Sequence, residues 1–128
     1  MSHILEIRKR TGQVVSFDAT KINRAVEKAF YAVTNDPHQR EADLVARTVV
    51  DRLAGRADAM GESYVPSVEE VQDIVEQSIM QQGFFDVAKS YIVYRYEHQK
   101  TRVEEQKVVQ EKIQNREKFK FSSAVFLL

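Results

Sequence analysis

The residues with the most readily assigned chemistry are three consecutive cations, Arg8-Lys9-Arg10, near the start of a chain of 128 residues. They end a short β-rich segment, where side chains alternate in direction, so Lys9 is expected to point away from the two arginines. The helix expected next offers free backbone N–H groups and a positive dipole end, which suit phosphate oxygens. Lys21 falls in its first turn, where a cation is unfavourable unless an anion lies nearby. The pattern predicts either an anion site or a solvated basic edge that deters strand pairing.

Other residue types used in catalysis lack the spacing that catalysis needs. His3, His38 and His98 lie in separate segments without metal-ligand spacing, so exposed or capping histidines are expected. Glu69 and Glu70 are neighbours in a predicted helix, where adjacent residues do not face each other, which argues against a carboxylate pair for acid–base chemistry. Neither a GxxxxGK[ST] phosphate loop nor a GxGxxG motif is present. We therefore expect no catalytic residues and no metal site in this chain.

Composition excludes further classes of site. The absence of cysteine removes disulfides, thiolate zinc sites, iron–sulfur clusters and thiol nucleophiles. With 19 basic and 19 acidic residues the formal net charge is zero, so no long-range field attracts nucleic acid or anionic lipid. No apolar run approaches the roughly 18 residues of a membrane span, and the first residues lack the apolar region of a signal peptide. These features favour a cytoplasmic protein that binds neither nucleic acid nor membrane.

The elements that must position the cations follow from apolar periodicity. Two β-rich runs around Gly12, within residues 4–17, are typical of a β-hairpin. Four stripes of apolar residues at helical spacing come next. The predicted helices have buried faces that span Ile22–Val33, Ala42–Leu53, Val71–Ile79 and Val87–Ile92.

Turn and capping residues predict the ends of the first two helices. Asp18 or Thr20 can cap the first helix. Asp36 can cap the second, with Pro37 at its first helical position. Gly55 is then the expected stop of the second helix.

The third helix has a more distinctive start. In the expected capping box, Ser67 accepts a hydrogen bond from an early backbone N–H while the Glu70 side chain reaches back to the N–H of Ser67. Gly83 is the expected stop, and the fourth helix begins near Phe84. Tyr91 lies in the apolar stripe of this helix, which favours packing over stacking on a base.

The C-terminal part of the sequence differs in character. Residues 96–120 are dense in charge with few aliphatic residues, which indicates a solvated extension that can continue as a helix. The last ten residues turn apolar again, as expected of a tail that docks on a partner or leads into something larger. The sequence thus predicts a domain over residues 1–98 and an extension or linker over residues 99–128.

Three motifs in fixed order give the chain a family resemblance. They are RKRTG at residues 8–12, FD followed by KI within residues 17–22, and VAKSYIVYR at residues 87–95. Over residues 3–98 the chain resembles the ATP-cone domain. The resemblance implies a mainly α (α+β) fold in which a small N-terminal β-hairpin caps a four-helix bundle.

The resemblance also implies a function. ATP-cone domains regulate the overall activity of ribonucleotide reductase: ATP leaves the enzyme active, whereas dATP drives its subunits into an inhibited oligomer. The expected ligands are ATP and dATP, accompanied by Mg²⁺, and the expected partners are reductase subunits in a nucleotide-dependent homo-oligomer. The two nucleotides must stabilise different arrangements, because a ligand of equal affinity for both states shifts nothing.

Residue by residue, the resemblance assigns three cations to the triphosphate. Lys9 and Arg10 match the family's phosphate-binding pair, and Lys21 matches its phosphate-binding lysine at the helix start. Ile7 and Ile22 match the apolar positions that flank the adenine.

The base and the sugar have further expected contacts. Asp18 matches a polar position that meets the amino group of the adenine, and Gln72 matches the residue near the sugar. Val68 replaces a hydroxyl residue of several relatives, and Glu97 stands where many carry a basic phosphate contact.

Other hypotheses about the function of this sequence remain open. The chain could be a helical interaction module whose residues 96–128 bind a partner, or a free-standing nucleotide sensor that acts in trans. A nucleotide-hydrolysing enzyme is a third reading, which lacks a phosphate loop and a metal-binding carboxylate pair. Without cysteines the chain itself contains neither a zinc ribbon nor the redox centre of a reductase.

Overall fold

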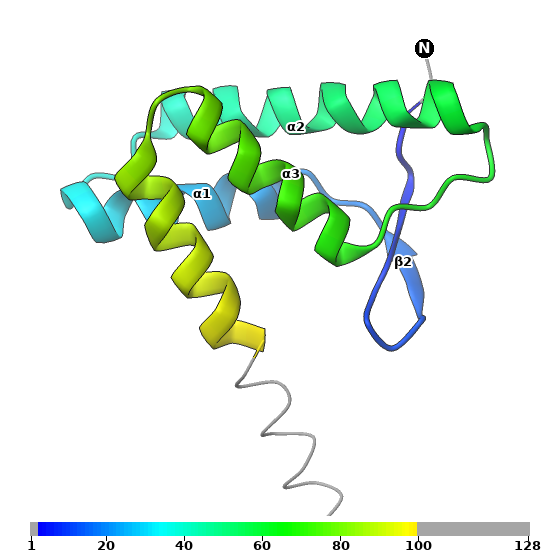
Figure 1. The fold of residues 1–128 in the computed structure, drawn as a ribbon, viewed down its shortest axis with the longest axis horizontal. Helices are drawn as coiled ribbons and strands as arrows, with labels where there is room; N and C mark the ends of the chain where they lie inside the picture. Colours follow the sequence, from blue (N-terminus) through cyan, green and yellow to red (C-terminus); the bar gives the residue numbers. More distant parts are fainter. Residues whose placement is uncertain (1–2, 100–128) are drawn as a thin grey trace, which may run out of the picture. The chain divides into compact units, whose positions relative to one another are not determined.

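The computed structural model describes residues 3–99 as a two-stranded antiparallel hairpin followed by helices, which confirms the predicted fold class (Figure 1). Residues up to Tyr94 form one compact unit. The expected extension over residues 99–128 lies almost wholly outside the described residues. The elements are β1 (Glu6–Arg8), β2 (Val14–Ser16), α1 (Thr20–Thr34), α2 (Gln39–Met60), α3 (Val68–Gln81) and a fourth helical segment that begins at residue 85.

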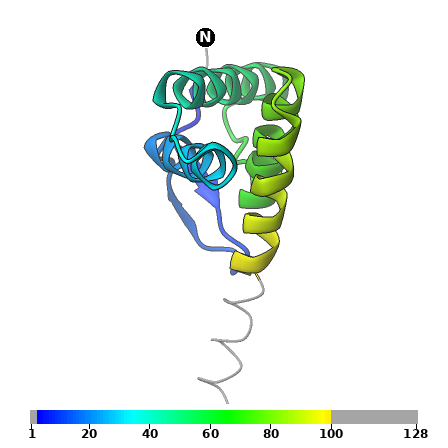
Figure 2. The ribbon, with the colours of Figure 1, turned by 90° about the vertical axis from the view of Figure 1, so that its left-hand side faces the viewer.

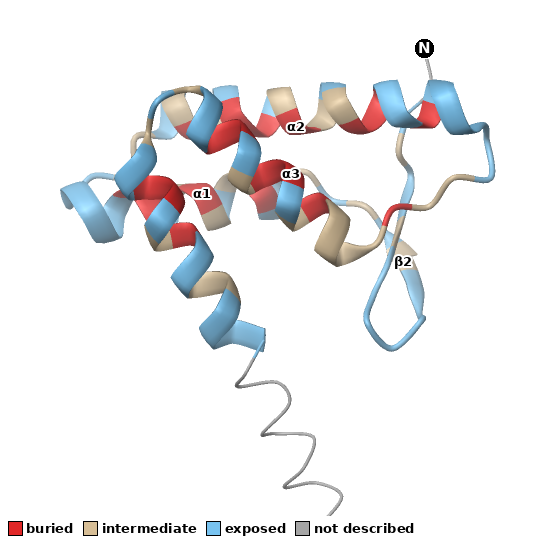
Figure 3. Cartoon of the chain, viewed as in Figure 1, coloured by how far each residue is buried: buried red, intermediate tan, exposed pale blue. Residues whose placement is uncertain are grey.

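Four helices supply the core. Both α1 and α3 pack against α2; α1 runs alongside α2, whereas α3 crosses it (Figures 1 and 2). Their inward faces are buried and their outward faces are exposed, as Figure 3 shows. Phe84, just before the fourth helical segment, meets Phe30 of α1 edge to face, with ring centroids 5.1 Å apart. The largest side chains with almost no exposed surface are Leu53, Ile74, Ile79, Val26, Val45, Val49 and Val75.

The predicted apolar stripes are confirmed except at two positions. Tyr91 is buried, as expected for a packing role, but Val33 and Ile92 remain 43% and 41% exposed. Val33 lies in the last turn of α1, immediately before the chain leaves the helix. Ile92 follows buried Tyr91 by one residue, and a step of one residue rotates a helical side chain by about 100°. Periodicity therefore predicted the buried faces but extended them slightly too far.

The hairpin differs from expectation at its basic end. β1 stops at Arg8, so Lys9 and Arg10 lie in the turn and not in the strand. The backbone N–H of Lys9 donates to Gln13 and the Lys9 carbonyl accepts from Gly12, whose φ of 89° suits glycine. The prediction placed Lys9 and Arg10 in the strand, and this premise is wrong, so strand alternation does not apply to them.

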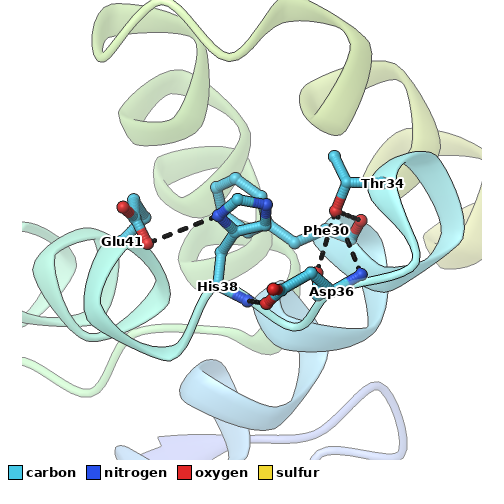
Figure 4. A network of polar contacts seen from close by, with 5 residues as sticks. All are labelled: Phe30, Thr34, Asp36, His38 and Glu41. Carbon is cyan, nitrogen blue, oxygen red and sulfur yellow. Dashed lines mark hydrogen bonds and ion pairs between the residues drawn. The ribbon is translucent and has the colours of Figure 1, made fainter.

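The connection between α1 and α2 is a tight polar turn (Figure 4). The Asp36 carboxylate accepts a 2.8 Å hydrogen bond from the backbone N–H of His38, whose φ of 48° is left-handed. The His38 ring lies 5.0 Å from that of Phe30, and its Nδ1 lies 3.6 Å from a Glu41 oxygen. Because His38 is left-handed, α2 begins only at Gln39, and the prediction that Pro37 occupies the first helical position is wrong.

The second helix also continues past its predicted stop. α2 passes through Gly55 and ends at Met60, before Gly61 with a φ of 100°. Glycine inside a helix costs about 1 kcal/mol relative to alanine. The helix persists because Ala54 and Ala57, on either side of Gly55, are still buried.

The ends of α3 agree better with expectation. The hydroxyl of Ser67 accepts a 3.1 Å hydrogen bond from the backbone N–H of Glu70, which confirms the predicted cap. α3 ends at Gln81, and Gly83 follows with a φ of 87°. At the start of α1, Asp18 accepts from the backbone N–H and the hydroxyl of Thr20, although the residue in the capping position is Ala19.

Candidate functional site

The hairpin is joined to the start of α3, which brings together residues that are distant in the sequence. The backbone N–H of Arg8 donates a 2.9 Å hydrogen bond to the carbonyl of Pro66. A parallel β-bridge links Arg8 to Ser67, the residue that caps α3. Ile7, Lys9 and Arg10 therefore flank the strand position that is bonded to this cap. The N-terminus of α3 carries a positive dipole end, so these cations and this helix end favour the same kind of ligand.

The three cations predicted to bind phosphate differ in whether they already form ion pairs. The side chains of Lys9 and Lys21 are exposed, and within residues 3–99 neither forms an ion pair. Arg10 is different, because its Nε lies 2.5 Å from Oε1 of Glu69 in the first turn of α3. Two of the three cations are thus available to an anion, and the third already holds one.

Asp18 is fixed at the junction between the hairpin and α1. Its Oδ1 accepts the hydroxyl of Thr20 at 2.6 Å and the Thr20 backbone N–H at 3.0 Å. These hydrogen bonds lower the pKa of Asp18, and the nearby charges of Lys21 and Arg24 lower it further. Asp18 is therefore an ionised acceptor at neutral pH, and both of these hydrogen bonds go to its Oδ1.

A second polar cluster supports the loop that leads into α3. Oε1 of Glu70 accepts a hydrogen bond from the hydroxyl of Tyr64 and another, 2.5 Å long, from Nη1 of Arg56. Burial raises the pKa of Tyr64 to about 12, and the hydrogen bond to Glu70 acts in the same direction. The Glu70 side chain thus ties the loop to α2, and the prediction that it reaches back to the N–H of Ser67 is wrong. Arg56 and Tyr64 were not singled out from the sequence.

The remaining predicted contacts lie on two elements. Ile22 is 7% exposed and belongs to the core at the start of α1, while Ile7 is half-buried and packs against that core. Val68 and Gln72 are half-buried residues of α3, four positions apart and so on one face of the helix. Both α3 residues follow directly on the cap that is bonded to the hairpin.

Within residues 3–99, no group of three or more His, Asp or Glu side chains is arranged to hold a metal ion. None of the helices in this range has the length and apolar character needed to cross a bilayer.

The hairpin, the helical core and the exposed cations of the hairpin turn and of the start of α1 define a small α+β domain with a candidate anion site. The ATP cone domain family matches residues 5–100 of the chain. The chain belongs to this family, which confirms the resemblance inferred from the three sequence motifs. ATP-cone domains are nucleotide-binding regulatory domains.

Similar proteins are ribonucleotide reductases. The chain is 40% identical over 108 residues to a vitamin B12-dependent ribonucleoside-diphosphate reductase of Thermoplasma acidophilum, a match that covers 80% of this chain and 13% of that protein. It is 41% identical over 101 residues to a ribonucleoside-diphosphate reductase subunit alpha of Chlamydia pneumoniae, covering 73% of this chain and 9% of that protein. A vitamin B12-dependent reductase of Mycobacterium tuberculosis is 38% identical over 90 residues, covering 70% and 12% respectively. The chain thus spans only a small part of these relatives.

Proposed function

We propose that this chain is an allosteric domain that binds ATP and dATP and controls the overall activity of a ribonucleotide reductase. The observation that carries the proposal is the pair of exposed lysines, Lys9 in the hairpin turn and Lys21 in the first turn of α1, in a domain of the ATP-cone family. Exposed cations without ion-pair partners in residues 3–99 suit a polyanionic ligand. The matched relatives are reductases, which supplies the enzyme class.

In the proposed binding mode, separate sets of residues contact the triphosphate, the adenine and the sugar. Lys9, Arg10 and Lys21 bind the triphosphate with its Mg²⁺. The apolar surfaces of Ile7 and Ile22 flank the adenine, for which Ile22 offers only its small exposed fraction.

Further residues contact the edge of the adenine and the sugar in this binding mode. The free oxygen of the Asp18 carboxylate accepts a hydrogen bond from the adenine amino group, because Thr20 occupies only Oδ1. Val68 and Gln72 lie beside the sugar and help to distinguish ribose from deoxyribose.

In this proposal the chain carries no catalytic residue of its own and acts in the cytoplasm. Its partners are reductase subunits, reached through residues 99–128 or through a domain that they connect. Residues 1–98 are the nucleotide-binding part. Regulation requires that dATP stabilise an associated state more strongly than ATP does.

Light scattering tests the regulatory part of the proposal. The particle mass of the chain is expected to rise when dATP is added and to rise less with ATP at the same concentration. The reason is that a ligand shifts the population only as far as it prefers the associated state over the dissociated one, and this preference is proposed to be larger for dATP. Equal masses with dATP, with ATP and without nucleotide, at concentrations that saturate binding, would contradict this mode of regulation.

A further inference from the structure

One cation of the proposed phosphate site is held by a carboxylate of the same chain. Arg10 Nε and Glu69 Oε1 lie 2.5 Å apart, although the two residues are 59 positions apart in the sequence. Their side chains are 33% and 39% exposed, so solvent and ligands can reach both. The pair connects the hairpin turn to the first turn of α3 at the junction where the proposed nucleotide site lies.

The fold keeps this carboxylate where a phosphate would be favourable. Glu69 is in the first turn of α3, where the helix dipole stabilises an anion. The hydrogen bond from Arg8 to Pro66 and the bridge from Arg8 to Ser67 hold the strand against the same turn. Arg10 follows Arg8 by two residues, so the backbone brings the guanidinium close to Glu69. The side chain therefore stays within reach of its carboxylate.

A carboxylate and a phosphate make the same demand on a guanidinium, since each offers oxygen acceptors to its fixed N–H donors. The Nε–H that Glu69 occupies cannot point at a phosphate oxygen at the same time. Lys9 and Lys21 impose no such competition, because neither forms an ion pair within residues 3–99. Among residues 3–99, only the Arg10 part of the phosphate site has an internal competitor.

We propose that Glu69 is a specificity-determining residue that competes with the nucleotide phosphates for Arg10. This inference rests on the proposed function, and it adds to that function an intramolecular limit on affinity. A ligand gains the full contribution of Arg10 only if its phosphates displace the carboxylate. Glu69 therefore lowers the affinity for phosphorylated adenine ligands and leaves the affinity for adenosine unchanged.

Calorimetric titration of Glu69→Gln with ATP and with adenosine tests the competition. Glutamine keeps the size of the side chain and removes its charge. We therefore expect the affinity for ATP to be at least about threefold higher than that of the wild-type chain. The affinity for adenosine is expected to stay within about twofold. The matched control is Asp51→Asn in the exposed middle of α2, which removes the same charge far along the sequence from Arg10 and is expected to change ATP affinity less.

A double-mutant cycle shows whether the effect acts through Arg10. In an Arg10→Ala background, Glu69→Gln is expected to give no gain in ATP affinity, because there is no guanidinium left for Glu69 and the phosphates to compete for. An unchanged or weaker affinity of Glu69→Gln for ATP would overturn the proposal. So would an equal gain for adenosine, a gain that persists without Arg10, or a gain matched by Asp51→Asn.

Two further outcomes are distinguishable. If the wild-type chain binds neither ATP nor dATP, the proposed function fails as a whole. If wild type binds but Glu69→Gln and Glu69→Ala both lose cooperative thermal unfolding, Glu69 is needed for the fold and the competition proposal is overturned alone.

Discussion

Replacing Lys9 or Lys21 by alanine is expected to weaken the binding of ATP and dATP by about tenfold each. Each side chain is exposed and forms no ion pair within residues 3–99, so its charge is available to a triphosphate. For the same reason the melting temperature should change little. Lys21→Ala is expected to raise it slightly, because a cation in the first turn of α1 opposes the helix dipole. Calorimetry and thermal unfolding of the same samples measure the two effects.

Lys89→Ala provides a matched control for both lysine variants. Lys89 is an exposed lysine of the fourth helical segment and has no role in the proposed nucleotide site. Its removal changes the net charge equally and should leave affinity within about twofold. A marked fall in melting temperature with unchanged nucleotide affinity, for Lys9→Ala or Lys21→Ala, would show that the lysines serve the fold and not a ligand.

The second large effect concerns the core. Leu53→Ala is expected to lower the free energy of unfolding by about 3 kcal/mol, because Leu53 is fully buried in α2 and its removal leaves a cavity. A domain of this size has only about 5–15 kcal/mol of stability in total. Urea denaturation followed by circular dichroism measures the change in midpoint.

Leu44→Ala on the same helix separates burial from helix propensity. Leu44 is 54% exposed, so the same substitution should cost no more than about 0.5 kcal/mol. If Leu53→Ala destabilises the domain no more than Leu44→Ala does, α2 does not form the centre of the core as described.

The elements of the fold could be predicted because they depend on local patterns. An apolar stripe at helical spacing has to be buried, so the faces that contain Val26, Val49 and Ile74 followed from the sequence. The helix ends were less accurate, since packing overrides local signals. Gly55 lies between two buried alanines and does not stop α2, and the left-handed backbone at His38 delays the helix that Pro37 was expected to begin.

In the candidate site too, features that depend on local sequence could be predicted, whereas features that depend on tertiary structure could not. The basic residues near Arg10 indicated either an anion site or a solvated basic edge, and the family resemblance supplied the nucleotide. The pairing of Arg10 with Glu69 could not be read from the sequence, because it joins residues that only the fold brings together. Glu70 illustrates the reverse case: a local capping role was expected, but Arg56 and Tyr64 become its partners once α2 lies beside the loop. A charged residue thus takes the partners that tertiary structure offers.

Calorimetric titration of the chain with ATP and with dATP shows whether the domain binds adenine nucleotides. Both nucleotides are expected to bind with dissociation constants below about 1 mM, and Lys9→Ala and Lys21→Ala are expected to weaken the binding of both. The proposed function would be contradicted if neither nucleotide bound to the folded chain below that concentration.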